Sequence, residues 1–113
     1  MTIGDATITV EKADTEAARE RGLSGRASLA PDTGMLFVFE YSQIRGFWMK
    51  DMRFPIDIVW ADETGKVVTI AENLSPDSYP QTFYPTSSAL YVLEVPAGFV
   101  KAHGIAVGDI MEL

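Results

Sequence analysis

The chain has 113 residues, of which 47% are hydrophobic and 22% charged, and it carries a formal net charge of −7 with no cysteine and one histidine. This length fits a single domain, residues 1–113, and the composition is that of a globular protein without repeats or low-complexity tracts. The acidic balance makes nucleic acid a poor partner, the lack of cysteine excludes disulfides and zinc–thiolate sites, and no apolar run is long enough for insertion in a membrane.

The first part of the chain is predicted to form two strands separated by a helix. Residues 6–13 alternate apolar and polar side chains, which is the pattern of a half-buried strand. Asp14 is a good N-cap for a helix over residues 15–21, and Gly22 suits its left-handed C-terminal position. Residues 23–34 are rich in turn formers and are expected to wrap the surface. MLFVFEY at 35–41 is apolar on both faces and is expected to be a central strand.

The second part is predicted to contain the remaining strands and a second helix. Strands are expected at 46–52 and 56–61, and the turn from Asp62 to Gly65 leads into a strand at 66–72. Residues 73–88 contain prolines without periodicity, so a long loop is expected there. ALYVLEV at 89–95 indicates a buried strand. Pro96 suits the start of a helix that ends near His103, before Gly104, and a final strand is expected within 105–113.

These elements predict an α+β fold that is mainly antiparallel β. The connections are mostly tight, and both helices are short. The expected architecture is a sandwich or partly closed barrel of about seven short strands with two short helices at its edges.

The segment RGFWMKDMRFPIDIVW at 45–60 places charges among apolar residues. Lys50 and Asp57 must be paired, solvated or bound to a ligand, because isolated burial of a charge costs several kcal/mol. A hairpin between residues 46–52 and 56–61 would pair Lys50 with Asp57 beside Trp48. The opposite side of that hairpin would be core and would consist of Phe47, Met49, Ile58 and Trp60.

Two interpretations of this hairpin remain open. In the first, Lys50 and Asp57 only fix the strand register, and Trp48 covers the seam between the strands. In the second, the three residues form a polar patch with an aromatic platform that binds a ligand. Aromatic residues of the predicted loop would extend such a patch, namely Tyr79, Phe83 and Tyr84.

Glu94 is a second acid within an apolar strand. Asp57 and Glu94 could act as the acid and base of a hydrolase if they lay about 5 to 9 Å apart. Each could instead be neutralised by an ion pair with Lys50, Arg21 or Arg26. His103 is expected to interact with the helix dipole rather than to act in catalysis. The sequence has no P-loop, dinucleotide-binding, EF-hand or nucleophile-elbow motif.

Six motifs occur in a fixed order along the chain: RGL at 21–23 with Arg26, GMLFVF at 34–39, FWMKDM at 47–52, PID at 55–57, VLEVPAG at 92–98 and GIAVGD at 104–109. In this order they resemble the bacterial and archaeal uncharacterised ACR family (domain of unknown function family one hundred and ninety-two). The resemblance spans residues 5–113 and implies a shared fold, but no activity, because the family has no established reaction. The positions that match its motifs and are candidates for a shared site are Arg21, Arg26, Trp48, Lys50, Asp57, Glu94 and Asp109.

The leading hypothesis is a non-catalytic binding module without cofactor or metal. Its ligand would be a small polar molecule, a glycan or a partner peptide, bound on the aromatic and charged patch. One alternative is a small hydrolase that uses Asp57 and Glu94, and the other is an accessory protein that pairs with a partner through a strand edge. We expect a monomer or weak dimer. Many relatives look exported, which favours an extracytoplasmic location if a leader precedes this chain and a cytoplasmic one otherwise.

Overall fold

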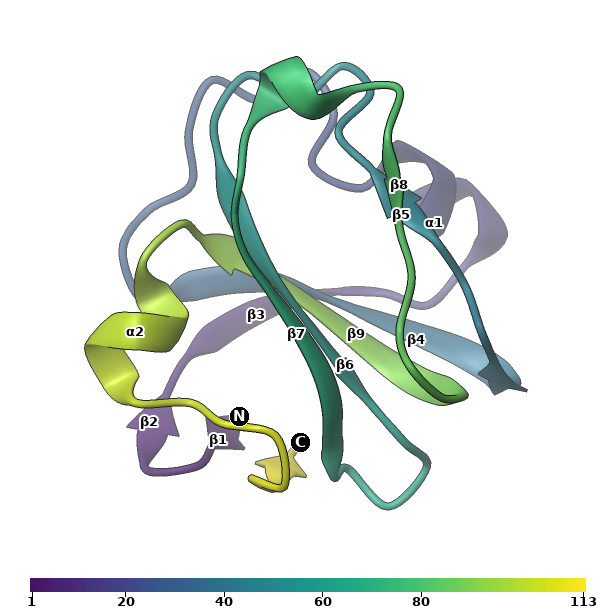
Figure 1. Ribbon diagram of the computed structural model, residues 1–113, viewed down its shortest axis with the longest axis vertical. Coiled ribbons are helices and arrows are strands. Elements are labelled where there is room, and N and C mark those ends of the chain that lie inside the picture. The colour runs from purple at the N-terminus through teal and green to yellow at the C-terminus, as the bar shows by residue number, and fades with distance from the viewer.

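A computed structural model describes all 113 residues (Figure 1). Its main element is a five-stranded sheet with the order β3-β4-β9-β6-β7, in which β3 and β4 are parallel and the other neighbours antiparallel. These strands are β3 Thr9–Ala13, β4 Thr33–Gln43, β6 Ile56–Ala61, β7 Val67–Leu74 and β9 Ala89–Pro96.

Two smaller sheets and two short helices complete the fold. One sheet has the order β10-β1-β2 and the other pairs β5 with β8. Their strands are β1 Thr2–Ile3, β2 Ala6–Thr7, β5 Phe47–Trp48, β8 Thr82–Phe83 and β10 Met111–Glu112. The helices are α1 Glu16–Arg21 and α2 Phe99–His103, with a 3₁₀ turn η1 Pro76–Ser78. Neither helix has the length or the apolar stretch needed to cross a membrane.

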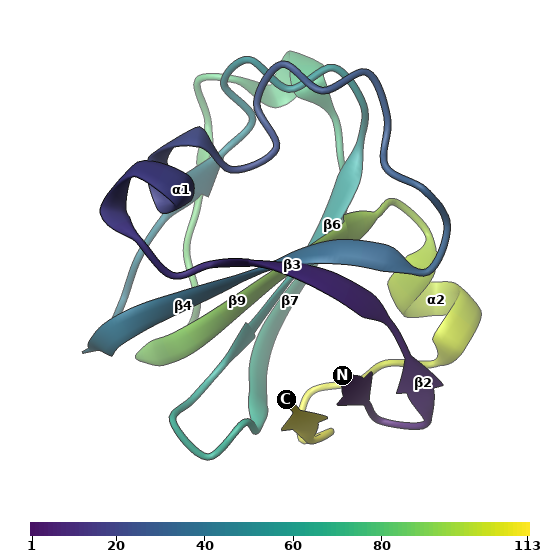
Figure 2. The same ribbon diagram turned by 180° about the vertical axis from the view of Figure 1, so that it is seen from behind.

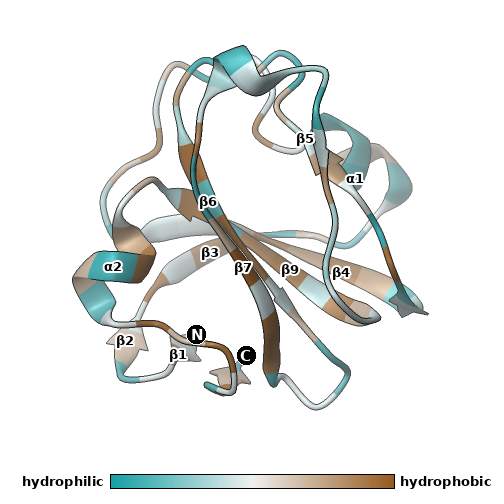
Figure 3. Cartoon of the chain, in the orientation of Figure 1, coloured by the Kyte–Doolittle hydropathy of each residue, from teal (hydrophilic) through white to brown (hydrophobic).

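Each face of the five-stranded sheet carries its own hydrophobic core. One core joins the sheet to β1, β2, β10 and α2 and includes Ile3 and Leu93. The other joins it to Leu23, to Met49 and to the β5–β8 pair, and includes Trp60. Figures 1 and 2 show the sheet crossing the molecule between these two layers, and Figure 3 shows its strands hydrophobic along much of their length. The architecture is therefore sandwich-like rather than a closed barrel, as expected for sheets covered on both faces.

Several predicted elements form where the sequence pattern placed them. The strands expected at 35–41, 56–61, 66–72 and 89–95 are β4, β6, β7 and β9. The turn between β6 and β7 also forms: the Gly65 N–H donates to the Asp62 carbonyl oxygen at 2.9 Å, with φ of 86° at Gly65. The hydrogen bond that Asp62 accepts from the Thr64 hydroxyl lowers the pKa of this carboxyl below its usual value. The Asp62–Gly65 turn therefore holds β6 and β7 together as a hairpin.

Replacing Gly65 with alanine is expected to lower the free energy of unfolding by about 1 to 3 kcal/mol. A Cβ atom at this position would lie 2.4 Å from the Met111 carbonyl oxygen, and the positive φ adds strain. Gly108→Ala is the matched control for urea denaturation, because Gly108 has φ of 99° but no neighbour within 4 Å of its Cβ position. Equal losses in the two variants would contradict a role for the Met111 contact.

Both helices begin at other residues than predicted. The N-cap of α1 is Thr15, whose Oγ1 accepts from the Ala18 N–H at 3.1 Å, and not Asp14. Pro96 is the last residue of β9, and α2 starts only at Phe99, after Gly98 turns the chain with φ of 93°. Residues 73–88 are not one loop but hold the end of β7, η1 and β8, and the final strand shortens to Met111–Glu112.

The predicted hairpin between residues 46–52 and 56–61 is wrong. β5 pairs with β8, and β6 lies between β7 and β9. The prediction failed because β6 is buried along both of its faces, so alternation cannot separate a core side from a solvent side. The residues that the predicted hairpin placed in the core do contribute to it. Met49, Ile58 and Trp60 are buried. Phe47 packs edge-on against Trp60, with ring centroids 6.2 Å apart.

Candidate functional site

A cavity of about 820 Å³ opens between α1 and the five-stranded sheet. Helix α1 and the turn that follows it form one wall, and residues 45–48 and 50–52 contribute another. Phe37 and Phe39 of β4 line it from the sheet. Glu94 of the central strand β9 lies at its base, since this residue is only 5% exposed. We call this space the Glu94 cavity.

Hydrogen bonds hold two walls of the Glu94 cavity together. The Ser24 hydroxyl donates to the Lys50 carbonyl oxygen at 3.3 Å, and the Gly25 N–H donates to the Asp51 carbonyl oxygen at 2.9 Å. Asp51 has φ of 60°, which turns the chain after Lys50 back toward the sheet. The turn after α1 and the segment after β5 are thus fixed relative to each other.

The Glu94 carboxyl has no partner within the protein. Its neighbours on the adjoining strands are Met35 and Ile58, and neither hydrogen bond nor ion pair reaches its oxygens. Burial raises the pKa of Glu94 from 4.5 to about 8. At neutral pH the group is therefore mostly protonated, and it offers one O–H donor and one carbonyl acceptor at the base of the cavity.

Two arginines share one aromatic ring in the Glu94 cavity. The guanidinium carbon of Arg45 lies 3.9 Å from the centroid of Phe39, and that of Arg19 lies 5.3 Å from it. Arg19 donates to the Val38 carbonyl oxygen at 2.9 Å, and Arg45 to the Ala89 carbonyl oxygen at 3.4 Å. Burial, and to a smaller extent the charge of Arg19, lower the pKa of Arg45. Neither guanidinium has an ion-pair partner.

The mouth of the cavity carries an exposed indole. Trp48 is 46% exposed, the Lys50 ammonium lies 5.6 Å from its ring centroid, and the ring of Tyr79 packs against it with centroids 5.1 Å apart. The prediction that loop aromatics approach Trp48 is thus confirmed for Tyr79. Phe83 instead pairs with Phe47 across β5 and β8, and Tyr84 is exposed beside Gly46.

Four of the seven predicted site residues line this single cavity: Arg21, Trp48, Lys50 and Glu94. Two others lie elsewhere. Arg26 pairs with Glu11, and the Asp109 carboxylate accepts from the Ala106 N–H at 2.9 Å within the GIAVGD turn. These contacts give both residues a local structural role.

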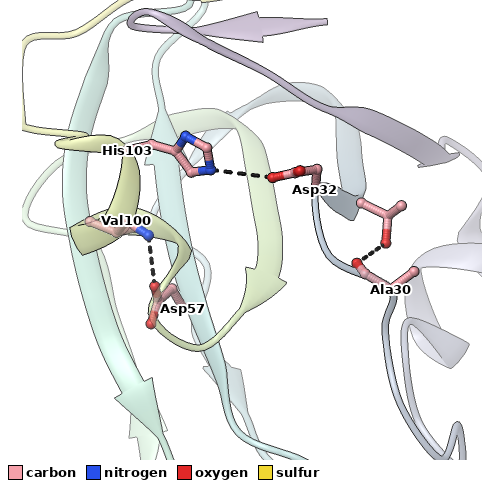
Figure 4. A network of polar contacts seen from close by, with 6 residues as sticks. Ala30, Asp32, Asp57, Val100 and His103 are labelled. Atoms are coloured by element: carbon pink, nitrogen blue, oxygen red, sulfur yellow. Dashed lines mark hydrogen bonds and ion pairs between the residues drawn. The ribbon is translucent and has the colours of Figure 1, made fainter.

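Asp57, the seventh predicted residue, is fully buried on the other face of the sheet. Its carboxylate accepts backbone N–H groups of Asn73 at 2.8 Å, Gly98 at 3.1 Å and Val100 at 3.0 Å, the last of which is drawn in Figure 4. In the register of β6 and β9, Asp57 lies opposite Val95, whereas Glu94 lies opposite Ile58. Asp57 and Glu94 therefore point to opposite faces.

This separation corrects three predictions. The Lys50–Asp57 ion pair does not form, and neither Asp57 nor Glu94 is neutralised by Arg21 or Arg26. The two carboxyl groups cannot act as an acid–base pair on one substrate, because the sheet lies between them. His103 does lie in the last turn of α2 as predicted, with its Nε2 3.3 Å from an Asp32 carboxylate oxygen (Figure 4).

A family model described as Uncharacterized ACR, a domain of unknown function, matches residues 1–113. The chain belongs to the Uncharacterized ACR family. A solved structure from Sinorhizobium meliloti 1021, described as a "putative transcription regulator", is 39% identical with a TM-score of 0.88, and the match covers 93% of this chain and 81% of that one. No curated protein matches the chain.

A second solved structure similar to this Uncharacterized ACR protein comes from Novosphingobium aromaticivorans DSM 12444 and is described as a protein of unknown function. It is 30% identical with a TM-score of 0.89, over 94% of this chain and 75% of that one. The family and fold predicted from the six ordered motifs are thereby confirmed. Within this Uncharacterized ACR protein, no three His, Asp or Glu side chains come together as potential metal ligands.

Proposed function

We propose that this Uncharacterized ACR protein is a non-catalytic binding module that holds a small ligand in the Glu94 cavity. The observation that carries the proposal is the Glu94 carboxyl, which is only 5% exposed, lines the cavity and makes no ion pair within the protein. No side-chain oxygen of the protein is both sealed from solvent and unbonded, so the Glu94 oxygens are open to the cavity. A ligand in the cavity can therefore bond to this carboxyl in place of water.

The remaining walls fit the general make-up of a small-molecule site. Such sites enclose roughly 300 to 1,000 Å³ and combine apolar or aromatic walls with a few polar anchors. The aromatic residues Phe37, Phe39, Phe47 and Trp48 supply the walls here, and Glu94 supplies the deepest polar anchor. Tyr79 supports the outer side of the Trp48 ring, which keeps this wall in place.

Two features argue against other functions for this cavity. The hydrolase hypothesis needs Asp57 as the partner of Glu94. The Asp57 carboxylate instead accepts hydrogen bonds from three backbone N–H groups on the opposite face of the sheet. Nucleic acid is a poor partner, because a chain with a net charge of −7 repels a phosphate backbone. Pairing through a strand edge stays a prediction, which the mass in solution at rising concentration would test.

Replacing Trp48 with alanine is expected to weaken ligand binding about tenfold or more, because an aromatic wall of a small site contributes on the order of 1 to 2 kcal/mol. The free energy of unfolding should change by less than about 1 kcal/mol, since the indole is half exposed. A library of small polar molecules, screened by thermal shift against wild type and Trp48→Ala, measures the effect on binding, and urea denaturation measures the effect on stability. In wild type the ¹⁵N signals of the two indole N–H groups show whether a ligand binds beside Trp48.

This screen has internal and external controls. The Trp60 indole donates to the Arg45 carbonyl oxygen at 3.3 Å beneath the cavity, so its signal reports that the fold is intact. Ile110→Ala is the matched variant, because Ile110 has the same 46% exposure as Trp48 but does not line the cavity. Ligands that bind wild type and Trp48→Ala equally well would contradict the proposal.

A further inference from the structure

The Glu94 cavity holds an unusual share of the protein's positive charge. Four of the nine basic residues of the chain line it, although the whole chain is acidic. The charged and titratable groups that line the cavity are Arg19 and Arg21 of α1, Arg45 and Lys50 of the opposite wall, and the acids Glu16, Glu20, Asp51 and Glu94. With Glu94 protonated at neutral pH, the cations outnumber the anions there.

Two guanidinium groups of the cavity meet at the Phe39 ring. Arg19 and Arg45 both lie within 5.3 Å of the same ring centroid and repel each other, yet no carboxylate of the protein pairs with either. Each is only half-buried and donates to one backbone carbonyl oxygen, which leaves several of its five N–H groups free. Two adjacent cations with free donors form a binding site for an anion.

We infer that the ligand of the Glu94 cavity is a small organic anion with a flat apolar body, of the class of aromatic carboxylates. Its carboxylate accepts hydrogen bonds from the guanidinium groups of Arg19 and Arg45 beside Phe39, and its flat body lies along the same cavity toward Glu94. Its ring packs against the aromatic walls described above. This inference rests on the proposed function and names the ligand class of the same site.

A cationic ligand fits these groups less well. It would require an ionised Glu94 among apolar neighbours, and it would lie beside two guanidinium groups that repel it. A neutral ligand could bond to Glu94 but would leave the two arginines without a counter-charge. An anion supplies the counter-charge that the two arginines lack within the protein, and this is the reason for preferring it.

The test uses three planar probes of nearly equal shape and different charge: benzoate, benzamide and benzamidine. Each is titrated into the ¹⁵N-labelled wild-type protein, and the Trp48 indole signal measures binding. Benzoate is expected to bind about tenfold or more tightly than benzamide, because charge-assisted hydrogen bonds are stronger than neutral ones. Benzamidine should bind most weakly.

Arginine variants and a pH series show which groups cause the preference for the anion. Arg45→Gln should reduce the affinity for benzoate about tenfold and change that for benzamide little, and Arg19→Gln should act in the same direction. Arg26→Gln is the matched control, because Arg26 pairs with Glu11 outside the cavity. The affinity for benzoate should also fall as the pH rises above about 8, where Glu94 loses its proton.

The possible results separate this inference from the proposed function. Tighter binding of benzamide or benzamidine at the Trp48 indole overturns the anion inference and leaves the proposed binding site intact. Failure of benzoate to bind at millimolar concentration overturns the anion inference as well. If in addition no member of the wider polar library shifts the Trp48 indole, the proposed function is also wrong. A Trp60 indole signal that stays at a folded-state position in each variant, even where the change at Arg45 shifts it, shows that any loss is not unfolding.

Discussion

Asp57→Ala is expected to lower the free energy of unfolding by about 3 to 5 kcal/mol, because it leaves three backbone N–H groups without their acceptor. These groups belong to Asn73, Gly98 and Val100, and the Asp57 side chain that serves them is fully buried. The carboxylate joins β6 to the end of β7 and to the start of α2, and Figure 4 shows its contact with Val100 of α2. Its loss should therefore loosen α2 before the rest of the fold.

Asp62→Ala is the matched control for this prediction. The Asp62 carboxylate also accepts three hydrogen bonds, two from N–H groups of Thr64 and Lys66 and one from the Thr64 hydroxyl, but in an exposed turn. Water replaces these bonds, so the loss should be about 1 kcal/mol. Urea denaturation of both variants measures the difference. A loss at Asp57 no larger than that at Asp62 would contradict the structural role of the buried carboxylate.

Glu94→Gln is expected to make the protein more stable than wild type above pH 4.5, with a gain that grows toward pH 8. The folded protein keeps the Glu94 proton up to about pH 8, whereas the unfolded chain releases it near pH 4.5. Between these values the native state binds more protons, so rising pH lowers wild-type stability by about 1.4 kcal/mol per pH unit. Across the whole window the change approaches about 5 kcal/mol.

The measurement is the difference in unfolding free energy between wild type and Glu94→Gln across this pH range. The difference should be constant below pH 4.5, where both states are protonated, and constant again above about pH 8, where both are ionised. Asp51→Asn, which removes an exposed acid that lines the same cavity, is the control for the loss of a cavity carboxylate. A pH-independent difference for Glu94→Gln would show that this carboxyl is ionised in the folded state.

These two acids show how far the sequence could define the site. Both Asp57 and Glu94 stand out as charges inside apolar strands, and both are indeed buried. Their roles differ because they lie on opposite faces of the sheet. Asp57 accepts hydrogen bonds from backbone N–H groups, whereas Glu94 lines an open cavity. The face to which each side chain points depends on the register between β6 and β9. These strands lie far apart in the sequence, at Ile56–Ala61 and Ala89–Pro96, and no local pattern specifies their register.

The fold was more predictable than the site because it depends on local signals. Long apolar strands such as β4 and β9, and the Asp62–Gly65 turn, follow directly from hydrophobic pattern and turn chemistry. The pairing of β5 with β8 could not be predicted, since each strand has only two residues and their partners are far apart in sequence. The local signal against a β5–β6 hairpin was the apolar run at residues 58–61 of β6, which has no alternating polar residue and indicates a strand covered on both faces.

Sequence reasoning missed Arg19, Arg45 and Phe39 as site residues. Arg19 lies within the helix predicted at 15–21 and Arg45 begins the segment at 45–60, but only Lys50 and Asp57 stood out there as charges among apolar residues. Their meeting at Phe39 requires the packing of α1 against β4, a tertiary contact. A hint was present in the charge distribution, because the basic residues are concentrated in the first 53 residues of an acidic chain.

The most direct test of the binding site is a ¹³C NMR titration of the Glu94 carboxyl in the free protein and in the presence of each ligand found in the screen. We predict a midpoint near pH 8 in the free protein and a clear displacement of that midpoint when a ligand is bound, upward for an anion. A midpoint near 4.5, or one that no bound ligand moves, would contradict the claim that this unpaired carboxyl is the anchor of a binding site.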